Sequence, residues 1–400
     1  MKESEPCLYR GITMDIKQLD QEYIVPTYAR FPICLKEGKG SCVTDDTGKT
    51  YIDLGTGIAV NGFGVADEEW IAAVTEQLGK IQHTSNLYYN EPCAKLAEQL
   101  CLRTGMKKVF FSNSGAEANE CAIKTARKYG ELHKGAEYTT IITLKDGFHG
   151  RTITTLAATG QEVFHKDFLP LTDGFVYAEA NNLADVERLA SEFPCCAVMF
   201  EVVQGEGGVR PLSAEFLSGL EKLAHQKELL LIADEVQTGN GRTGKLYGYM
   251  NYGIQPDIVT TAKGLGGGLP IGATMLGEKV STVLGAGMHG STFGGNPVCC
   301  AGALNILSRI DEVLLAGVQM RSNYIFDTLT NAPGIKSVTG LGLMIGIECE
   351  KPAAEVIDAC RERGVLVIKA KHKVRLLPAL NIKMEELKQA IEIIKEACAV

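Results

Sequence analysis

The middle of the chain alternates short apolar runs with longer amphipathic stretches. An uninterrupted apolar run is typical of a strand that is buried on both faces, as in a parallel sheet covered by helices. The alternation therefore predicts an α/β unit with a mostly parallel sheet and helices on either side. The predicted strands lie at 107–113, 139–147, 195–203, 228–235 and 256–263, and the predicted helices run from Ser114 to about Tyr129 and from Ser213 to about Lys227.

The two ends of the chain have a different pattern. Residues 40–54 contain an Asp-Thr-Gly turn between alternating residues and predict a hairpin. Beyond about Asn296, a helical stretch is followed by glycine-broken strands and by a final helix from Met384. We expect a small α+β domain assembled from both ends of the chain. The expected division is 1–65 as an N-terminal part of the small domain, 66–295 as the large domain and 296–400 as the C-terminal part of the small domain.

Composition narrows the class of protein. The 400 residues are 45% hydrophobic and 22% charged, as in soluble globular proteins. A net charge of −8 argues against a nucleic-acid-binding or membrane-binding surface. The N-terminal stretch lacks the apolar core of a signal peptide, which predicts a cytoplasmic location. The 13 cysteines include no C-x-x-C pair, so reduced thiols are expected in place of disulfides or a metal site.

The first candidate for chemistry is the helix start in "FFSNSGAEANE" (110–120). Ser114 and Glu117 have the spacing of a capping box, which marks the beginning of a helix. Free backbone N–H groups at a helix start also bind phosphate, and Gly115 leaves room for an anion to approach them. The segment therefore indicates a capped helix, with or without a bound phosphate.

The second candidate is Asp234, which follows the apolar run 229–233. A carboxylate at the end of a buried strand needs a cationic partner. Ligands of open parallel sheets bind beyond the carboxyl ends of the strands, so a cationic ring nitrogen of a ligand fits this position. An arginine of the protein or a divalent metal would also meet the need, but no histidine cluster accompanies Asp234, and no metal site is predicted.

The third candidate is Lys263, in "TTAKGLGGGLPIGA" (260–273). The glycines after it remove bulk, so another group can approach the amine closely. Desolvation lowers the pKa of an amine and makes it a nucleophile toward carbonyls. One cofactor needs all three features: pyridoxal phosphate has a phosphate for the helix start, a ring nitrogen for Asp234 and an aldehyde for Lys263.

The sequence resembles the class III pyridoxal-phosphate aminotransferases over nearly its whole length. The resemblance implies the fold of the type I pyridoxal-phosphate transferases, with a large α/β domain and a smaller α+β domain. It rests on nine motifs in the family's order: "TYARFP", "YIDLGTGIAVN", "SNSGAEANE", "GFHGRT", "QGEGGV", "DEVQTGNGRTG", "AKGLGGGLPIG", "STFGGNP" and "VRLLPALNI".

The resemblance assigns roles around the cofactor ring. It implies that Lys263 forms the Schiff base, that Asp234 pairs with the pyridine nitrogen and that Gln237 binds the ring hydroxyl. Phe148 and Val236 would cover the two faces of the ring, although either could be ordinary core.

The resemblance also implies a homodimer with shared sites. Gly115 and Ala116 would donate N–H groups to the phosphate, and Thr292 would reach the phosphate bound by the neighbouring subunit. Residues 280–308 contain no Asp, Glu, Lys or Arg but six glycines, which is typical of a closely packed subunit or cofactor surface and not of a membrane helix.

Two arginines are implied to bind the substrates. An enzyme of this kind takes a donor whose carboxylate is far from the reacting amine, then 2-oxoglutarate, whose carboxylate adjoins the carbonyl. By resemblance, Arg151 binds the distant carboxylate and Arg375 the near one, and Glu206 pairs with Arg375 until 2-oxoglutarate arrives. Arginine suits both positions because its guanidinium binds carboxylates through two hydrogen bonds.

Gly57 bears on the donor. Ornithine-specific relatives carry a tyrosine at this position, and glycine leaves room for an acyl group, with Tyr28 and Ser291 expected to line the pocket. The expected reaction transfers the δ-amino group of N2-acetyl-L-ornithine to 2-oxoglutarate, as in arginine biosynthesis. Succinylornithine, succinyldiaminopimelate, ornithine and 4-aminobutyrate are competing donors. Two different classes of protein also fit the cofactor site: an aminomutase, decarboxylase or racemase of the same fold, and a non-catalytic cofactor-binding protein.

One segment departs from the family pattern. A G-H-x-H-P motif usually follows "AVN", but here Gly64 is followed by Val65, Ala66 and Asp67. We expect a change in loop packing, because none of the roles above belongs to this segment.

Overall fold

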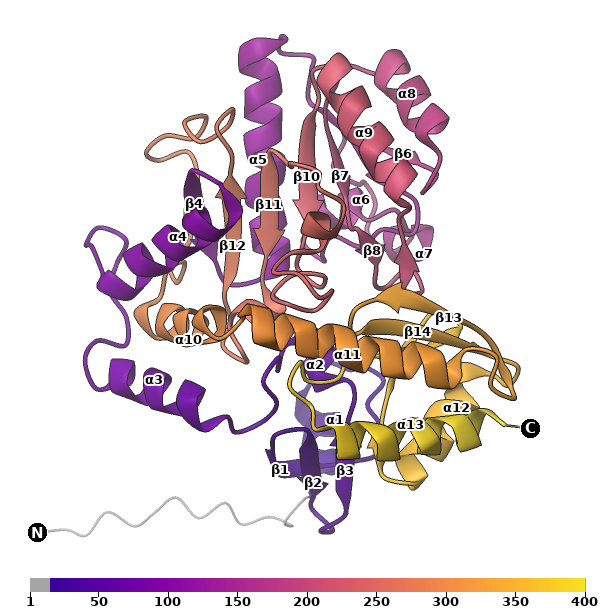
Figure 1. Ribbon diagram of the computed structural model, residues 1–400. Coiled ribbons are helices and arrows are strands. Elements are labelled where there is room, and N and C mark those ends of the chain that lie inside the picture. The colour runs from indigo at the N-terminus through magenta and orange to yellow at the C-terminus, as the bar shows by residue number, and fades with distance from the viewer. Residues whose placement is uncertain (1–14, 400) are drawn as a thin grey trace, which may run out of the picture.

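A seven-stranded sheet forms the centre of the larger part of the molecule in the computed structural model, which describes residues 15–399 (Figure 1). Four neighbouring pairs are parallel, while β12 is antiparallel to both of its neighbours. The mostly parallel sheet is thus confirmed, with one reversed strand that the sequence pattern does not predict. The strand order is β4 (Lys108–Ser112), β12 (Gly272–Leu276), β11 (Ile258–Thr261), β10 (Leu230–Asp234), β7 (Cys195–Phe200), β5 (Thr140–Leu144) and β6 (Phe175–Ala178).

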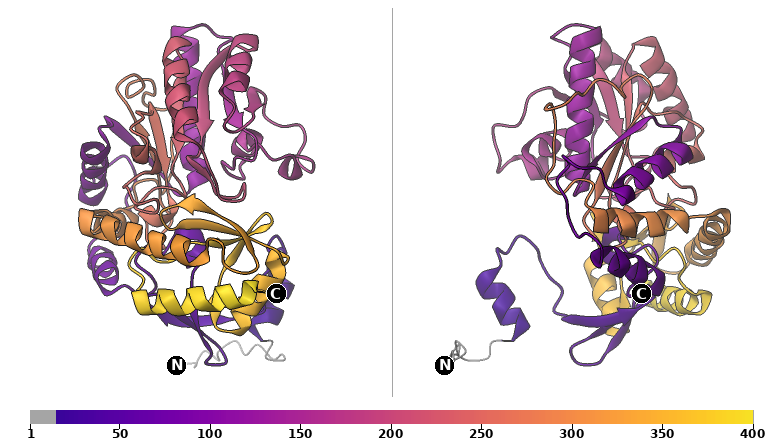
Figure 2. Two further views of the ribbon diagram at one scale, coloured as in Figure 1. Left: turned by 45° about the vertical axis from the view of Figure 1, so that its right-hand side comes forward. Right: turned by 90° about the vertical axis from the view of Figure 1, so that its left-hand side faces the viewer.

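Helices cover both faces of this sheet, as the apolar strands predict. Side chains of β10 alternate between two core clusters: Leu231 joins the cluster of α9 (Ala214–Gln226), whereas Ile232 joins that of α5 (Gly115–His133). Figure 2 shows α5 and α9 on opposite sides of the strands. α8 (Leu183–Glu192) packs beside α9 and contacts β5 and β6. Burial on both faces explains why these strands read as unbroken apolar runs.

The N-terminal caps of two helices lie where the sequence predicts them, but one helix ends later than predicted. Ser213 caps α9, and Ser114 caps α5, as expected. However, α5 continues beyond Tyr129 to His133. Gly130 does not end the helix but allows a close contact, because a Cβ there would lie 2.0 Å from the carbonyl oxygen of Tyr138.

The smaller part of the molecule combines both ends of the chain (Figure 1). β3 from the N-terminal hairpin pairs in parallel with β15 from the C-terminal region. One sheet has the order β1 (Leu35–Lys39), β2 (Cys42–Asp45), β3 (Thr50–Asp53), β15 (Val365–Leu366), and the other β13 (Ile335–Leu341), β14 (Met344–Cys349), β17 (Lys373–Leu376), β16 (Ile368–Ala370). The helices of this part are α11 (Glu312–Leu329), α12 (Ala353–Glu362) and α13 (Met384–Cys398).

Two helices that follow the expected boundary at residue 65 pack against one that follows the expected boundary at residue 295. α10 (Pro297–Ser308) packs against α3 (Glu68–Leu78) and α4 (Glu91–Thr104). The core cluster of the large sheet includes Ile306 and Leu307 of α10. The expected division at residues 65 and 295 stays a prediction.

The remaining elements are short. α1 projects away from the body of the molecule in the right-hand view of Figure 2. Between residues 15 and 399, no helix is both long and apolar enough to cross a membrane. The short elements are α1 (Ile16–Tyr23), α2 (Thr56–Ala59), α6 (Ile153–Ala158), α7 (Glu162–His165), β8 (Val203–Gln204), β9 (Arg210–Pro211) and the 3₁₀ helices η1 (Gly248–Asn251) and η2 (Lys263–Leu265).

The segment that departs from the family pattern forms a tight junction. Gly40 and Val65 exchange two backbone hydrogen bonds of 2.8 Å. Asp67 then caps α3 by accepting the N–H of Trp70 at 2.9 Å, and it binds Arg309 through two hydrogen bonds of 2.5 and 2.9 Å. The guanidinium of Arg309 lies 4.0 Å from the ring centre of Phe63. Asp67 thus joins the start of α3 to the end of α10.

Candidate active site

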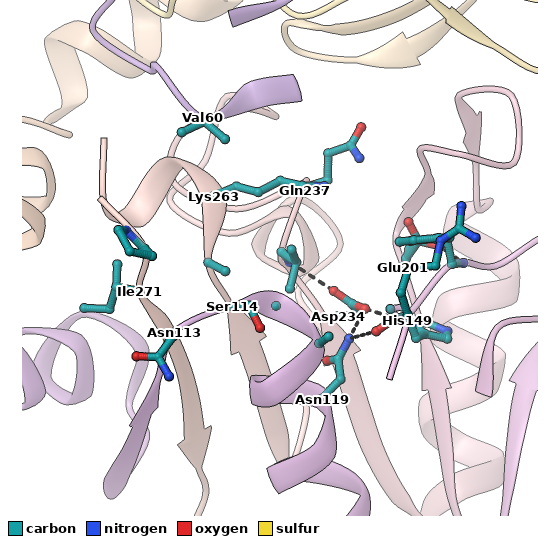
Figure 3. Close-up of a pocket in the computed structure, with 18 of the residues that line it drawn as sticks. Val60, Asn113, Ser114, Asn119, His149, Glu201, Asp234, Gln237, Lys263 and Ile271 are labelled. Carbon is teal, nitrogen blue, oxygen red and sulfur yellow. Dashed lines mark hydrogen bonds and ion pairs between the residues drawn. The ribbon is translucent and has the colours of Figure 1, made fainter. Parts of the chain in front are cut away.

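A cavity of about 450 Å³ opens at the carboxyl edge of the large sheet. Asp234 ends β10, and Lys263 follows β11, so both reach the same edge, where ligands of open α/β sheets bind. Figure 3 shows their side chains in the cavity. Eight of the predicted site residues line it: Gly115, Ala116, Phe148, Arg151, Asp234, Val236, Gln237 and Lys263.

Asp234 is buried and has protein partners. Its Oδ2 accepts a hydrogen bond from Asn119 Nδ2 at 2.7 Å and lies 2.8 Å from His149 Nδ1. Its Oδ1 accepts the backbone N–H of Val236 at 3.1 Å. The sequence left an arginine open as the partner of Asp234. Within residues 15–399, the basic side chain that contacts Asp234 is His149 and not an arginine. A carboxylate oxygen accepts more than one hydrogen bond, so Oδ1 can still bind a cationic ring nitrogen.

The charge of Asp234 acts on His149. Burial lowers the pKa of a histidine, but the hydrogen bond and the negative charge of Asp234 outweigh burial, so the pKa of His149 is raised. Asp234 thus stabilises the cationic form of His149 relative to a free imidazole, and the contact with His149 compensates part of the cost of burying Asp234.

Lys263 adopts an unusual backbone conformation. Its φ of 45° lies in the left-handed region, which costs energy for a residue with a side chain and is concentrated at functional sites. Burial lowers the pKa of its amine, although the charge of Glu206 opposes this effect. The glycines after it have separate uses. Gly268 lines the cavity, whereas a Cβ on Gly266 would lie 2.1 Å from the carbonyl oxygen of Leu269, so that glycine serves the turn.

The start of α5 lies at the cavity and is capped by side chains. Ser114 Oγ accepts the N–H of Glu117 at 3.2 Å. The Glu117 carboxylate reaches back to the N–H of Asn113 at 2.7 Å, one residue before the position expected for a capping box. The N–H groups of Gly115 and Ala116 belong to the first turn, where a helix offers no partner, and both residues line the cavity.

The two candidates for the ring faces lie beside the cavity. A Cβ on Gly115 would lie 2.6 Å from a methyl group of Val236, so glycine is required for Val236 to pack here. Phe148 packs edge-on against Phe164 with ring centres 6.0 Å apart. The exposed guanidinium of Arg151 lies 3.9 Å from the ring centre of Phe164 and 5.5 Å from that of Phe148, which orients it at the cavity.

An ion pair between a buried arginine and a partly buried glutamate connects a loop of the large domain to the small domain. Arg375 of β17 is 2% exposed, and its Nη1 donates to Glu206 Oε1 at 2.6 Å and to Gln237 Oε1 at 3.1 Å. Burial would raise the pKa of Glu206, but the charge and hydrogen bonds of Arg375 hold it below its usual value. The predicted pairing of Glu206 with Arg375 is thus present in the geometry, and Gln237 joins it.

Four further predicted residues do not line this cavity. Tyr28 is 74% exposed. Gly57 has a φ of 63°, and a Cβ there would lie 3.7 Å from Val60, which lines the cavity. Ser291 and Thr292 line a second cavity of about 910 Å³. The roles expected for these four residues stay predictions.

Sequence reasoning missed three polar residues beneath the cavity. Asn119 and His149 bind Asp234, and Glu201 accepts backbone N–H groups from two loops. His149 lies directly after Phe148 inside the motif "GFHGRT", and Glu201 directly follows the apolar run of β7. Asp234 was identified as a polar residue at the end of a buried strand. The same signal is present at Glu201 and could have identified it.

Comparison with known proteins agrees with this geometry. The family model described as Aminotransferase class-III matches residues 23–398. The chain belongs to the class-III aminotransferases. It is 48% identical to an acetylornithine aminotransferase of Haemophilus ducreyi, over 95% of this chain and 98% of the relative. It is 43% identical to a succinylornithine transaminase of Yersinia pseudotuberculosis, over 94% of both chains.

A solved structure gives the same fold for this class-III aminotransferase. The ornithine aminotransferase from Toxoplasma gondii ME49 superposes with a TM-score of 0.91 at 30% identity, covering 96% of this chain and 94% of that one. The type I transferase fold is thereby confirmed. The three relatives are named for three different donors, so membership of the family alone does not select one.

Class-III aminotransferases depend on pyridoxal phosphate, and the residues present fit this cofactor. The fit rests on the set of groups at one cavity: the first-turn N–H groups of α5, a carboxylate oxygen of Asp234 with spare capacity and the amine of Lys263. The protein is a pyridoxal-phosphate-dependent aminotransferase that acts on small molecules.

Proposed function

We propose that this aminotransferase transfers the δ-amino group of N2-acetyl-L-ornithine to 2-oxoglutarate. The products are N-acetyl-L-glutamate 5-semialdehyde and L-glutamate, and the reaction belongs to arginine biosynthesis. The observation that carries the proposal is the pair of arginines at the site. Arg375 is buried and engaged by Glu206, whereas Arg151 is exposed at the cavity, so the site offers one carboxylate position that is open and one that opens only when Glu206 leaves.

Residues of this chain would hold the cofactor. The first turn of α5 binds the phosphate, Asp234 and Gln237 bind the ring, Phe148 and Val236 cover its faces, and Lys263 binds the aldehyde. Bound pyridoxal phosphate supplies a carbonyl for the amine and a ring that withdraws electrons. Burial lowers the pKa of Lys263, so its amine loses its proton more readily than an ordinary lysine and is suited to take a proton from the donor's δ-carbon.

The two arginines would separate the two half-reactions. The donor's carboxylate lies far from its reacting amine and binds Arg151, while Glu206 keeps Arg375 neutralised. 2-Oxoglutarate brings a second carboxylate next to its carbonyl, and this carboxylate displaces Glu206 from Arg375. Arg375 stays in place because Gln237 Oε1 also accepts from its Nη1.

The choice of an acylated donor rests on Gly57 and on the relatives. The segment around Gly57 lies next to Val60, which lines the cavity, so a bulky side chain in this segment would reduce the space for the acyl group. Relatives named for acetylated and for succinylated ornithine both match the chain over nearly its whole length. The higher identity to the acetylornithine aminotransferase favours the acetyl donor.

A donor panel tests this proposal. Glutamate formation from 2-oxoglutarate is measured with N-acetylornithine, succinylornithine, ornithine and 4-aminobutyrate. We expect kcat/KM for N-acetylornithine to exceed that for ornithine by about a hundredfold or more, because an unfilled acyl pocket and a charged α-amino group both disfavour ornithine. Equal or better use of ornithine contradicts the role of Gly57.

We also propose that the active form is a cytoplasmic homodimer in which Thr292 reaches the phosphate bound by the neighbouring subunit. Support comes from the second cavity, which Ser291 and Thr292 line apart from the cofactor cavity of their own chain, and from the charge-free, glycine-rich run 280–308 that holds both residues. A mass in solution of twice 43.1 kDa is expected from light scattering, and an active monomer contradicts the shared site.

A further inference from the structure

Glu201 lies beneath the cavity, at the end of β7, and is 6% exposed. Its Oε1 accepts the backbone N–H of Phe148 at 2.9 Å, and its Oε2 accepts that of Gly205 at 3.2 Å. The two donors lie in different loops, one after β5 and the other after β8. One side chain therefore connects two loops that share no strand pairing with each other at this point.

The two loops carry different parts of the site. The loop of Phe148 also holds His149, which contacts Asp234, and Arg151. Gly205 directly precedes Glu206, which contacts Arg375. A change in the separation of the two loops therefore moves the aromatic face of the cavity relative to this ion pair.

A carboxylate is the side chain that these contacts require. Both partners are N–H donors, so both terminal atoms of residue 201 must be acceptors, and a glutamine offers one acceptor and one donor. An aspartate is shorter by one methylene. Burial is the main cause that raises the pKa of Glu201, to about 7, and the charge of His149 opposes it. Glu201 is thus kept in an unfavourable place for a charge, and its two N–H contacts compensate for this.

We propose that Glu201 is a positioning residue that fixes the loop of Phe148 against the turn of Glu206 and so determines how firmly the cofactor ring is held. This proposal rests on the cofactor site described above but not on the identity of the donor. Glu201 needs no contact with substrate for this role. Its effect passes through Phe148 on one side and Gly205 on the other.

The chain offers a matched control in Glu235. It is fully buried, its pKa is also raised to about 7 by burial, and it also accepts two backbone N–H groups, from Gly248 and Tyr249, at 2.7 Å each. These donors are the first two residues of η1, and Glu235 does not line the cavity. Glu235 also accepts the Thr238 hydroxyl at 2.6 Å and lies between Asp234 and Val236 in the chain. Glu235→Gln therefore removes a buried carboxylate at this strand end while leaving the loops of Phe148 and Gly205 unchanged, and it controls for a general disturbance of the site.

The test measures the dissociation constant of pyridoxal phosphate by fluorescence and the visible circular dichroism of the bound cofactor, without any substrate. We expect Glu201→Gln to weaken cofactor binding by about tenfold, from the loss of one charge-assisted hydrogen bond, and Glu201→Ala to weaken it further. The visible dichroism of the cofactor should fall in the same order. Glu235→Gln should bind the cofactor within about twofold of the wild type.

Several results would overturn the proposal. Cofactor binding by Glu201→Gln at wild-type strength would do so, and so would an equal loss in Glu235→Gln, which would show a general effect of removing a buried carboxylate. If the Glu201 variants do not fold, hydrogen exchange in the wild type decides: the Phe148 and Gly205 amides must exchange slowly although both lie in loops, and fast exchange of either removes the proposal. An enzyme that binds the cofactor as predicted but ignores N-acetylornithine contradicts the proposed function alone.

Discussion

At the scale of single residues, three buried carboxylates lie close together at or beside the site: Asp234, Glu201 and Glu235. Asp234 is compensated by His149 and Asn119. Glu201 is stabilised by the charge of His149 and by two backbone N–H groups, and Glu235 by the Thr238 hydroxyl and by two backbone N–H groups. Burial raises the pKa of Glu201 and of Glu235 to about 7. These two groups therefore change charge near neutral pH, and the stability of the fold must depend on pH there.

Glu235 gives a pH dependence with a definite sign. Its pKa is raised from 4.5 to about 7 in the folded protein, so the folded state holds its proton more tightly than the unfolded state. Stability from this group is fully present below about pH 4.5 and is lost as the pH rises through about 7. The free energy of unfolding of the wild type should thus fall, relative to Glu235→Gln, by about 3 kcal/mol between these pH values.

Urea unfolding of the two proteins at a series of pH values measures this difference. Above about pH 8, the difference in the free energy of unfolding between the wild type and Glu235→Gln should be constant, and measurements in that range serve as an internal control. A difference that does not change with pH, or that grows as the pH rises, contradicts the raised pKa of Glu235.

Sequence reasoning at this scale found the residues with a chemical signature of their own. Lys263 and Asp234 interrupt apolar runs at strand ends, which predicts that they share one site, and they line one cavity. His149 and Asn119 were missed because their function depends on Asp234, which lies far from both along the chain. A hydrogen bond between distant segments leaves no pattern in a single sequence.

At the scale of elements, Asp67 joins α3 to α10 in the segment that departs from the sequence pattern expected of the family. Asp67 has two partners, the N–H of Trp70 at the start of α3 and the guanidinium of Arg309 after α10. Arg309 also stacks on Phe63. One side chain thus caps a helix and joins two helices, at a position where the family motif is absent.

Two substitutions separate these contributions. Asp67→Asn retains a good N-cap and loses the charge, so it should lower the free energy of unfolding by about 1 kcal/mol. Asp67→Ala loses the cap as well and should lower it by about 2 kcal/mol. Denaturant unfolding measures both, and neither variant should change the KM for either substrate. Equal stability of the two variants would show that the cap contributes nothing.

Elements can be predicted where their pattern is local. Ser213 and Ser114 mark helix starts correctly, because the capping side chain and its N–H partner lie within three residues. The reversed strand β12 is not predictable in this way, because direction in a sheet depends on the path of the chain and not on the composition of the strand. Gly130 directly follows the predicted helix end. In the structure it lies inside α5, where its lack of a side chain allows a close contact with the backbone of Tyr138.

At the scale of the whole molecule, the two domains meet at the carboxyl edge of the large sheet. Arg375 comes from the small domain, and Glu206 and Gln237 come from loops of the large one, so the ion pair spans both. The exposure of Tyr28 and the position of Thr292 in a second cavity could not be derived from sequence patterns, because they depend on the overall arrangement and, under our proposal, on a second subunit.

The absorbance of the purified enzyme with its cofactor is the decisive measurement. We expect a long-wavelength band from cofactor bound to Lys263, which N-acetylornithine abolishes and 2-oxoglutarate then restores. Lys263→Ala is the control, and it should lose the response by a factor of about a thousand or more in rate. A band that responds to ornithine or 4-aminobutyrate but not to N-acetylornithine would contradict the proposed donor. The absence of the band in the presence of excess cofactor would contradict the site itself.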